Sequence, residues 1–167
     1  MKTKAPKVRS HDKIKERMPQ SLVKNYIHIT FSTKNRFPFI SDSIKEELFK
    51  YLGGTCRELE SLPVIIGGTK DHVHLLVNLS RKIALMSLIE KLKTHSSKWI
   101  KTKDNSFKNF YWQHGYGGFS VSPNQVDPVK RYIVNQEIHH KKVTFKEEFR
   151  AFMKDYNIEY DERYVWD

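Results

Sequence analysis

Cysteine is almost absent from the sequence, which has one such residue, Cys56, among 167. A single thiol excludes an intrachain disulfide framework and a cysteine-rich metal site, and we expect it to be buried in the core. Long apolar runs are also absent. None approaches the ~20 residues of a membrane-spanning helix, and no apolar segment of a signal peptide appears near the start. We therefore expect a cytoplasmic protein with no membrane contact.

Acidic residues are scarce relative to basic ones. The chain has 19 aspartates and glutamates against 30 lysines and arginines, which gives a net charge of +11. An excess of this size indicates a polyanionic partner, with nucleic acid first. A membrane surface is a poorer candidate, because no predicted helix is both strongly basic and strongly amphipathic.

The length is that of one domain, and a chain of this size can bury a core without a disulfide or a zinc site. Residues 1–20 are basic, polar and poor in large apolar side chains, so we predict that they form a flexible N-terminal arm. Residues 21–167 then make up a single domain that includes the C-terminal tail.

Hydrophobic periodicity predicts strands and helices in the order β-α-β-β-α-β-α. The expected strands lie within residues 22–34, 62–69, 72–79 and 110–122. The expected helices begin at Ser43, Ile83 and Asp127, and a short one follows in the tail. Ser43 and Glu46 have the spacing of a capping box, and Asp127 before Pro128 is typical of a helix N-terminus.

This order is typical of the α+β class with the ferredoxin-like split βαβ arrangement, a four-stranded antiparallel sheet with helices on one face. The last helix would carry a tyrosine and complete the domain. In such a fold the second face of the sheet is open to a ligand or to a further element. The side chains expected on that face are Tyr26, His28, Thr30, His72 and His74.

The stretch "KDHVHLLVNL" places two histidines, His72 and His74, inside an apolar strand. Side chains at positions i and i+2 of a strand share a face, so the two imidazoles project side by side. Backbone positions roughly 6–7 Å apart let both rings reach one metal ion or one phosphate. The alternative is a pair of half-exposed histidines without a function.

A second group of polar residues follows in "VKRYIVNQEIHH". Tyr132 and Gln136 are four residues apart, so they lie one turn apart on one helix face, and His139 and His140 extend it. A tyrosine can act as a covalent nucleophile, and a glutamine can offer its carbonyl oxygen to a metal. The alternative is a tyrosine packed by its ring and a glutamine in solvent.

The combination of "HVH" with a later "YIVNQ" resembles the single-tyrosine HUH transposases of the smallest bacterial insertion sequences, the IS200-like group. Four stretches carry the resemblance in order: "IHITFSTKNR", "GYGGFSVS", "NQEIHH" and "YDERYVW". It extends from about Met18 to the C-terminus, and the basic arm before Met18 is not part of the pattern.

The resemblance implies a metal-dependent enzyme that cuts and rejoins single-stranded DNA at hairpin-bearing ends. His72 and His74 would be the HUH pair, Gln136 the third metal ligand, and Tyr132 the nucleophile that forms a 5′-phosphotyrosine bond. The metal would be Mg²⁺ or Mn²⁺, of which Mn²⁺ suits two imidazoles and an amide oxygen better. No organic cofactor is needed. The resemblance also implies a homodimer with active sites shared between its subunits.

Other features leave alternatives open. Lys91, Lys98 and Lys101 line the polar face of the 83–103 helix, where they either contact DNA or are simply solvated. The catalytic set does not include His114, His139 or His140. The function itself has three alternatives: a relative that processes chromosomal palindromes by the same chemistry, a non-catalytic nucleic-acid-binding protein, and an inactive remnant retained as a regulator.

Overall fold

The computed structural model describes residues 21–166, and the predicted flexible arm over residues 1–20 lies outside them. The strands are β1 (Tyr26–Ser32), β2 (Leu62–Gly68), β3 (His72–Asn78) and β4 (Gly117–Val121). The helices are α1 (Asp42–Glu58), α2 (Leu85–Ile100), α3 (Val126–Val134), α4 (Gln136–His139) and α5 (Phe145–Asp155). No helix among these residues is long and apolar enough to span a bilayer.

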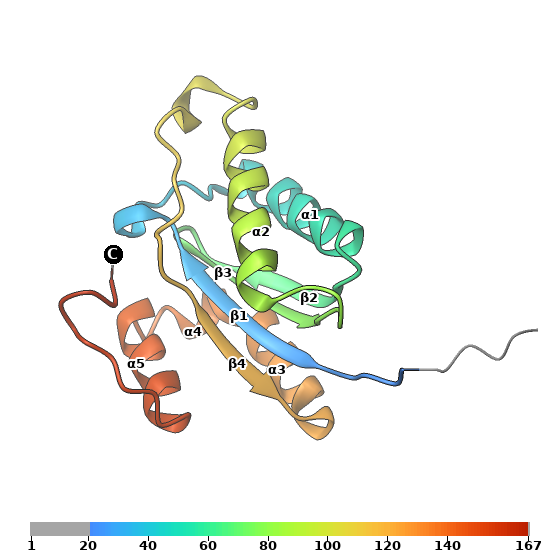
Figure 1. The fold of residues 1–167 in the computed structure, drawn as a ribbon. Helices are drawn as coiled ribbons and strands as arrows, with labels where there is room; N and C mark the ends of the chain where they lie inside the picture. The colour runs from blue at the N-terminus through green and yellow to red at the C-terminus, as the bar shows by residue number, and fades with distance from the viewer. Residues whose placement is uncertain (1–20, 167) are drawn as a thin grey trace, which may run out of the picture.

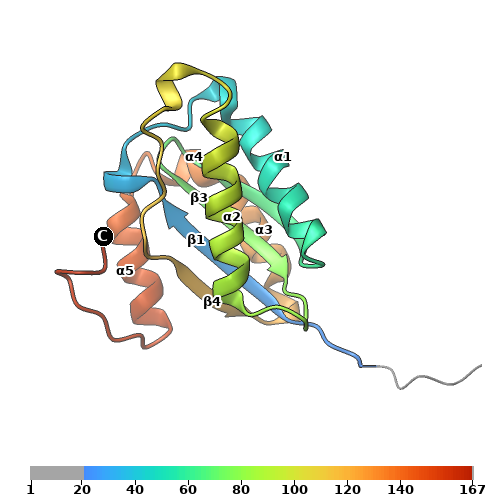
Figure 2. The same ribbon diagram turned by 45° about the horizontal axis from the view of Figure 1, so that its top comes forward.

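The four strands form one antiparallel sheet in the order β2-β3-β1-β4. Helices α1 and α2 cover one face, while α3, α4 and α5 lie on the other (Figure 1 and Figure 2). The predicted α+β ferredoxin-like sheet with an added C-terminal tyrosine helix is therefore confirmed.

Successive side chains of the central strands point to opposite faces of the sheet, and this divides the interior into layers. The odd-numbered residues of β3 face α1 and α2 in the main core, which contains Val73, Leu75, Val77, Ile29, Phe31, Leu48, Leu52, Leu88 and Leu92. Cys56 is buried in the same core, as expected. The even-numbered residues point to the opposite face, where Leu76 packs with Val121 and Ile133. A third cluster joins Phe119 of β4 to the apolar side of α5.

The histidine-bearing face is not open to solvent. Elements α3, α4 and α5 cover it, and the exposed fractions of His28, His72 and His74 are 3%, 1% and 0%. The sequence predicts that this face is open to a ligand or to a further element. In the structure the further element is present, because α3, α4 and α5 cover the face.

Several predicted helix limits were wrong. Helix α1 is capped at Ser41, two residues before the predicted Ser43, and no capping box with Glu46 forms. Ser43 instead lies in the first turn, and its hydroxyl contacts that of Ser41 at 2.9 Å. The capping box that does form joins Thr144 to Glu147 at the start of α5.

The predicted 127–140 helix is two helices. It begins earlier than Asp127, at Val126, because a 3₁₀ turn over Pro123–Gln125 leads into it. It is interrupted at Asn135, whose ψ of 15° departs from helical values, and α4 follows directly. The fourth strand is also shorter than predicted, because before Gly117 the chain meets its neighbour only through the isolated Thr33–Trp112 bridge.

Gly67 allows α3 to lie directly on the sheet. It pairs with His74 across β2 and β3, and a Cβ at Gly67 would be 2.8 Å from both Cγ2 and the carbonyl oxygen of Ile133. We expect Gly67→Ala to lower the free energy of unfolding by about 1–3 kcal/mol through overpacking. Urea denaturation measures this.

Gly54→Ala is the matched control, because nothing lies within 4 Å of a Cβ built at Gly54 in α1. An alanine in a helix interior is expected to raise stability there by roughly 0.5–1 kcal/mol. Equal stability of Gly67→Ala and the wild type would contradict the close approach of α3.

Candidate active site

The buried face of the sheet brings together all four residues predicted as nucleophile and metal ligands. His72 and His74 project from β3 toward α3, α4 and α5. Gln136, the first residue of α4, has its Oε1 3.3 Å from Nε2 of His72. Tyr132 of α3 has its ring edge-on to that of His74, with the ring centroids 5.8 Å apart. All of these contacts form within one chain.

Each histidine of the pair is held through its Nδ1 atom. Nδ1 of His72 lies 2.6 Å from a carboxylate oxygen of Asp71 and 2.9 Å from the Thr69 hydroxyl. Nδ1 of His74 lies 2.9 Å from Nε2 of His28 on β1. Metal-binding histidines typically bond an outer partner in this way, which fixes the tautomer and directs the other nitrogen at the metal. In both rings, Nε2 is the atom directed to the common centre.

The contact between His72 and Gln136 also supports a metal position in front of the Nε2 atoms. Asp71 has a lowered pKa: burial is the largest single effect and opposes ionisation, but the hydrogen bonds from His72 and Thr69 and the positive charge of nearby histidines together outweigh it. A carboxylate only accepts hydrogen bonds, so Nδ1 of His72 carries a proton, and in a neutral ring Nε2 then bears a lone pair. Nε2 of His72 faces the oxygen of Gln136 at 3.3 Å. If both atoms are hydrogen-bond acceptors, a proton or a metal ion between them is needed to make this short distance favourable.

Two side chains that the predicted set did not include complete the cluster, the buried Glu148 and the partly exposed His140. Nε2 of His140, just after α4, and Oε2 of Glu148 on α5 are 3.3 Å apart. Oε2 of Glu148 is also 3.4 Å from Nε2 of His74, and its Oε1 accepts a hydrogen bond from the Gln136 amide. The sequence held one signal for Glu148, because it interrupts an otherwise apolar helix face formed by Phe145, Phe149 and Phe152.

Burial drives these groups toward their neutral forms. Desolvation lowers the pKa of His28 and of His140 to about 4, and it lowers the pKa of His74 well below its usual value. Burial, followed by the nearby Asp71 charge, raises the pKa of Glu148 to about 8. The close contact of His140 with Glu148 is therefore not an ion pair at neutral pH.

The residues fit a divalent metal ion. Ligand atoms of His72, His74, His140 and Glu148 all lie within 4.8 Å of one another. Among the described residues, Nε2 of His74, Nε2 of His140 and Oε2 of Glu148 are buried without a hydrogen-bond partner. Unpaired buried polar atoms are costly. A cation bound among them would satisfy all three, and neutral imidazoles with oxygen ligands are a donor set that first-row divalent metals accept.

The Tyr132 hydroxyl belongs to the same group of unsatisfied atoms. It is buried and has no hydrogen-bond partner among residues 21–166, although its ring packs edge-on against His74, His139 and Phe152. The phenol is therefore left unpaired beside the cluster that fits a divalent metal ion.

The predicted DNA-binding lysines lie elsewhere. Lys91 and Lys98 are on α2 and Lys101 caps its C-terminus, and this helix lies across the sheet from the histidine cluster (Figure 2). The structure therefore does not bring them to the active site. The ammonium group of Lys101 lies 3.7 Å from the ring centroid of the exposed Tyr111, a cation–π contact.

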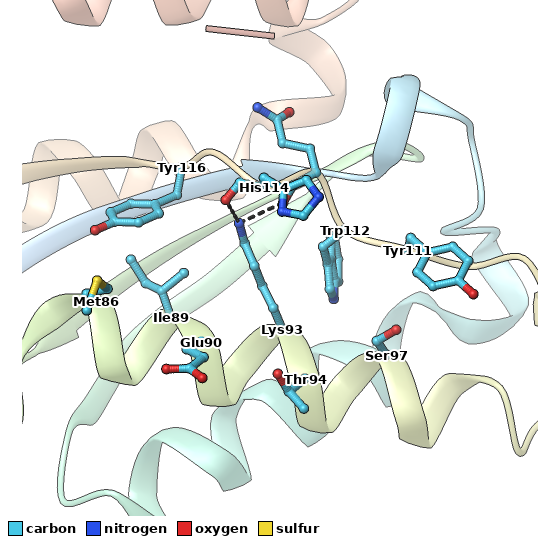
Figure 3. Close-up of a pocket in the computed structure, with 11 residues that line it drawn as sticks. Met86, Ile89, Glu90, Lys93, Thr94, Ser97, Tyr111, Trp112, His114 and Tyr116 are labelled. Carbon is cyan, nitrogen blue, oxygen red and sulfur yellow. Dashed lines mark hydrogen bonds between the residues drawn. The ribbon is translucent and has the colours of Figure 1, made fainter. Parts of the chain in front are cut away.

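A cavity beside these lysines is lined by α2 and by residues 111–116 (Figure 3). Lys93 points into it and donates to the carbonyl oxygens of Gln113, His114 and Gly115 at 2.7–2.9 Å. Burial lowers the pKa of Lys93 to about 8. Its three donors are all used, so Lys93 anchors this loop and leaves no donor for a ligand.

Comparisons with known proteins place the chain in a family. A family model described as "Transposase IS200 like" matches residues 21–136. No curated protein sequence matches the chain. A Deinococcus radiodurans R1 crystal structure described as a transposase is 21% identical, with a TM-score of 0.56, covering 71% of this chain and 96% of that one. A REP-associated tyrosine transposase bound to a REP hairpin is 15% identical, also with a TM-score of 0.56, covering 75% of this chain and 74% of that one.

Proposed function

Because the chain belongs to the IS200-like transposase family, we propose that it cuts and rejoins single-stranded DNA through a covalent 5′-phosphotyrosine bond at Tyr132. One observation carries the proposal: the unpaired Tyr132 hydroxyl lies on the same buried face as the unpaired Nε2 of His74. Cleavage of DNA from the flanks of the gene, with and without a divalent metal, tests it. Intact DNA under both conditions, with hairpin binding retained, would instead favour a non-catalytic DNA-binding protein.

The proposed step exchanges one phosphodiester for another. The Tyr132 oxygen attacks the scissile phosphorus, the bond from phosphorus to the 3′ oxygen breaks, and the phenolic proton is transferred to the leaving strand as a 3′-hydroxyl. Attack by a 3′-hydroxyl on the phosphotyrosine reverses the step and joins strands. Because the number of phosphodiester bonds is conserved, the reaction needs no nucleotide cofactor.

The chain's own residues would prepare the site for this step. His72, His74 and Gln136 would hold the metal, Mn²⁺ or Mg²⁺, which when bound polarises the phosphate and stabilises charge on its oxygens. Asp71 and His28 orient the two imidazoles through their Nδ1 atoms. Helices α3 to α5 cover the cluster, and burial keeps His74 unprotonated and able to ligate.

Hairpin recognition and assembly belong to the same proposal. The REP-associated relative is bound to a hairpin, and we extend hairpin binding to this chain as a hypothesis. A homodimer with shared active sites stays a prediction of the family resemblance, and within the described chain Tyr132 already lies beside its own His74. A cytoplasmic location, with access to the chromosome, is part of the proposal.

A relative that processes chromosomal palindromes would use the same chemistry. Hairpins beside the gene together with several genomic copies would favour a mobile element, and a single copy among scattered palindromes would favour the alternative.

Lys91, Lys98 and Lys101 are proposed to contact DNA phosphates away from the active site. If each neutralises one phosphate, the triple alanine variant should reduce the slope of log affinity against log salt by about 2, since a contact on single-stranded DNA contributes about 0.7. Fluorescence anisotropy at several salt concentrations measures this. Lys50→Ala, at an exposed position on α1, is the control, and an unchanged slope in the triple variant would show that the three lysines are solvated.

A further inference from the structure

Glu148 lies beyond residue 136, where the family match ends. We propose that helix α5 contributes Glu148 as an additional metal ligand, assisted by His140, so that the metal site is completed by the C-terminal part of the chain. This inference rests on the proposed function only in taking the histidine cluster to be a metal site.

The burial of Glu148 calls for a cation. Its exposed fraction is 4%, and no lysine or arginine among residues 21–166 forms an ion pair with it. Its polar neighbours are three histidines and the Gln136 amide. A buried carboxylate without a charged partner is strongly unfavourable unless it is protonated or bound to a metal. A divalent ion at the cluster supplies the missing charge.

The two carboxylate oxygens of Glu148 have different environments. Oε1 accepts a hydrogen bond of 3.2 Å from the Gln136 amide, which fixes the plane of the carboxylate. Oε2 forms no hydrogen bond, and it lies 3.4 Å from Nε2 of His74 and 3.3 Å from Nε2 of His140, both of which also lack partners. One anchored oxygen and one free oxygen directed at free imidazole nitrogens are the arrangement of a monodentate ligand.

The position of Glu148 is fixed by how α5 docks. The capping box of Thr144 and Glu147 sets where the helix starts, and Phe145, Phe149 and Met153 pack against Phe119 of the sheet. Glu148 shares this inward face. The polar residue is therefore held at the cluster by the packing of its neighbours, and a rotation of α5 that exposed Glu148 would also expose the phenylalanines.

Glu148 also determines which metals suit the site. With Glu148 and His140 added to His72, His74 and Gln136, three imidazole nitrogens and two oxygens favour Mn²⁺ and other first-row transition ions over Mg²⁺, which prefers oxygen ligands and retains its waters. The alternative is a purely structural role, in which a protonated Glu148 only fills space between α5 and the sheet. In that case its charge would not matter to metal affinity.

The test is Mn²⁺ binding to DNA-free protein, followed by the paramagnetic resonance signal of free Mn²⁺. Glu148→Gln keeps the size and the amide contact but loses the charge, and we expect affinity to fall at least tenfold. Asp155→Asn, which removes one exposed charge from the same helix, should bind like the wild type. Affinity of Glu148→Gln within twofold of the wild type would overturn the inference.

Two further variants keep the result interpretable. Glu148→Gln should fold without metal, as measured by thermal unfolding, because a neutral amide suits the buried position. If it does not fold, Glu148→Asp retains the charge but withdraws it by one methylene, and it should also weaken binding by several-fold; unchanged affinity would count against Glu148. Tyr132→Phe should bind Mn²⁺ normally, because the tyrosine is not a proposed ligand. If the wild type bound Mn²⁺ but did not cut DNA, the proposed function would be refuted and the assignment of Glu148 as a ligand would stand.

Discussion

Tyr132→Phe is expected to abolish strand cleavage, with a rate loss on the order of 10³-fold or more, as for other removed nucleophiles. Metal binding and DNA binding should persist, because the ring packs against His74 and Phe152 and the hydroxyl has no partner within the described chain. The variant should be at least as stable as the wild type, because an unpaired buried hydroxyl is removed. Gel assays of cleavage and thermal unfolding measure both effects.

Tyr156→Phe is the matched control. Its hydroxyl donates a hydrogen bond of 2.8 Å to the carbonyl of Ser120 on the same side of the sheet, so the substitution removes a structural bond without touching the cluster. It should lose a little stability and retain cleavage. Wild-type cleavage by Tyr132→Phe would exclude Tyr132 as the nucleophile.

His74→Asn is expected to have the second large effect. The asparagine amide can occupy the place of Nδ1 and keep the contact with His28, while the position of Nε2 is lost. Metal affinity should fall by at least the roughly 10- to 100-fold that even outer-shell substitutions cause. Cleavage should fall with it. Titration with Mn²⁺ and a cleavage assay at saturating metal separate lost binding from lost chemistry.

His114→Asn is the control for His74→Asn, because His114 is exposed on the other side of the sheet, beside the Lys93 cavity. It should bind metal and cut DNA normally. If His74→Asn bound Mn²⁺ as tightly as the wild type, the buried histidine cluster would not be a metal site.

A mixture of the two inactive variants, Tyr132→Phe and His74→Asn, addresses the predicted sharing of active sites. Each chain as described holds its own Tyr132 beside its own His74. If the subunits do not exchange helix α3, which carries Tyr132, the mixture stays inactive. Recovered cleavage would show that a dimer pairs the tyrosine of one subunit with the histidines of the other.

The parts of the site that follow local periodicity could be predicted from the sequence. A two-residue period places His72 and His74 on one face of β3, and a spacing of four keeps Tyr132 near Gln136 even though Asn135 interrupts the helix between them. These relations depend only on backbone geometry over a few residues.

The remaining parts depend on contacts between distant segments. Glu148 reaches the cluster only because α5 docks on β4 through Phe119, and no local pattern encodes that contact. His140 joins it through the turn after α4. By contrast, the predicted ferredoxin-like arrangement already placed the helix that carries Lys91 and Lys98 across the sheet from the histidines, and the structure agrees.

Covalent capture tests the central claim most directly. The protein would be incubated with single-stranded DNA from the flanks of its gene, labelled on the 3′ side of the cleavage site, and separated on a denaturing gel. The account predicts a labelled protein band that requires a divalent metal, disappears in Tyr132→Phe and maps to a peptide containing Tyr132. Metal-dependent cleavage without any labelled protein, or a band that persists in Tyr132→Phe, would contradict it.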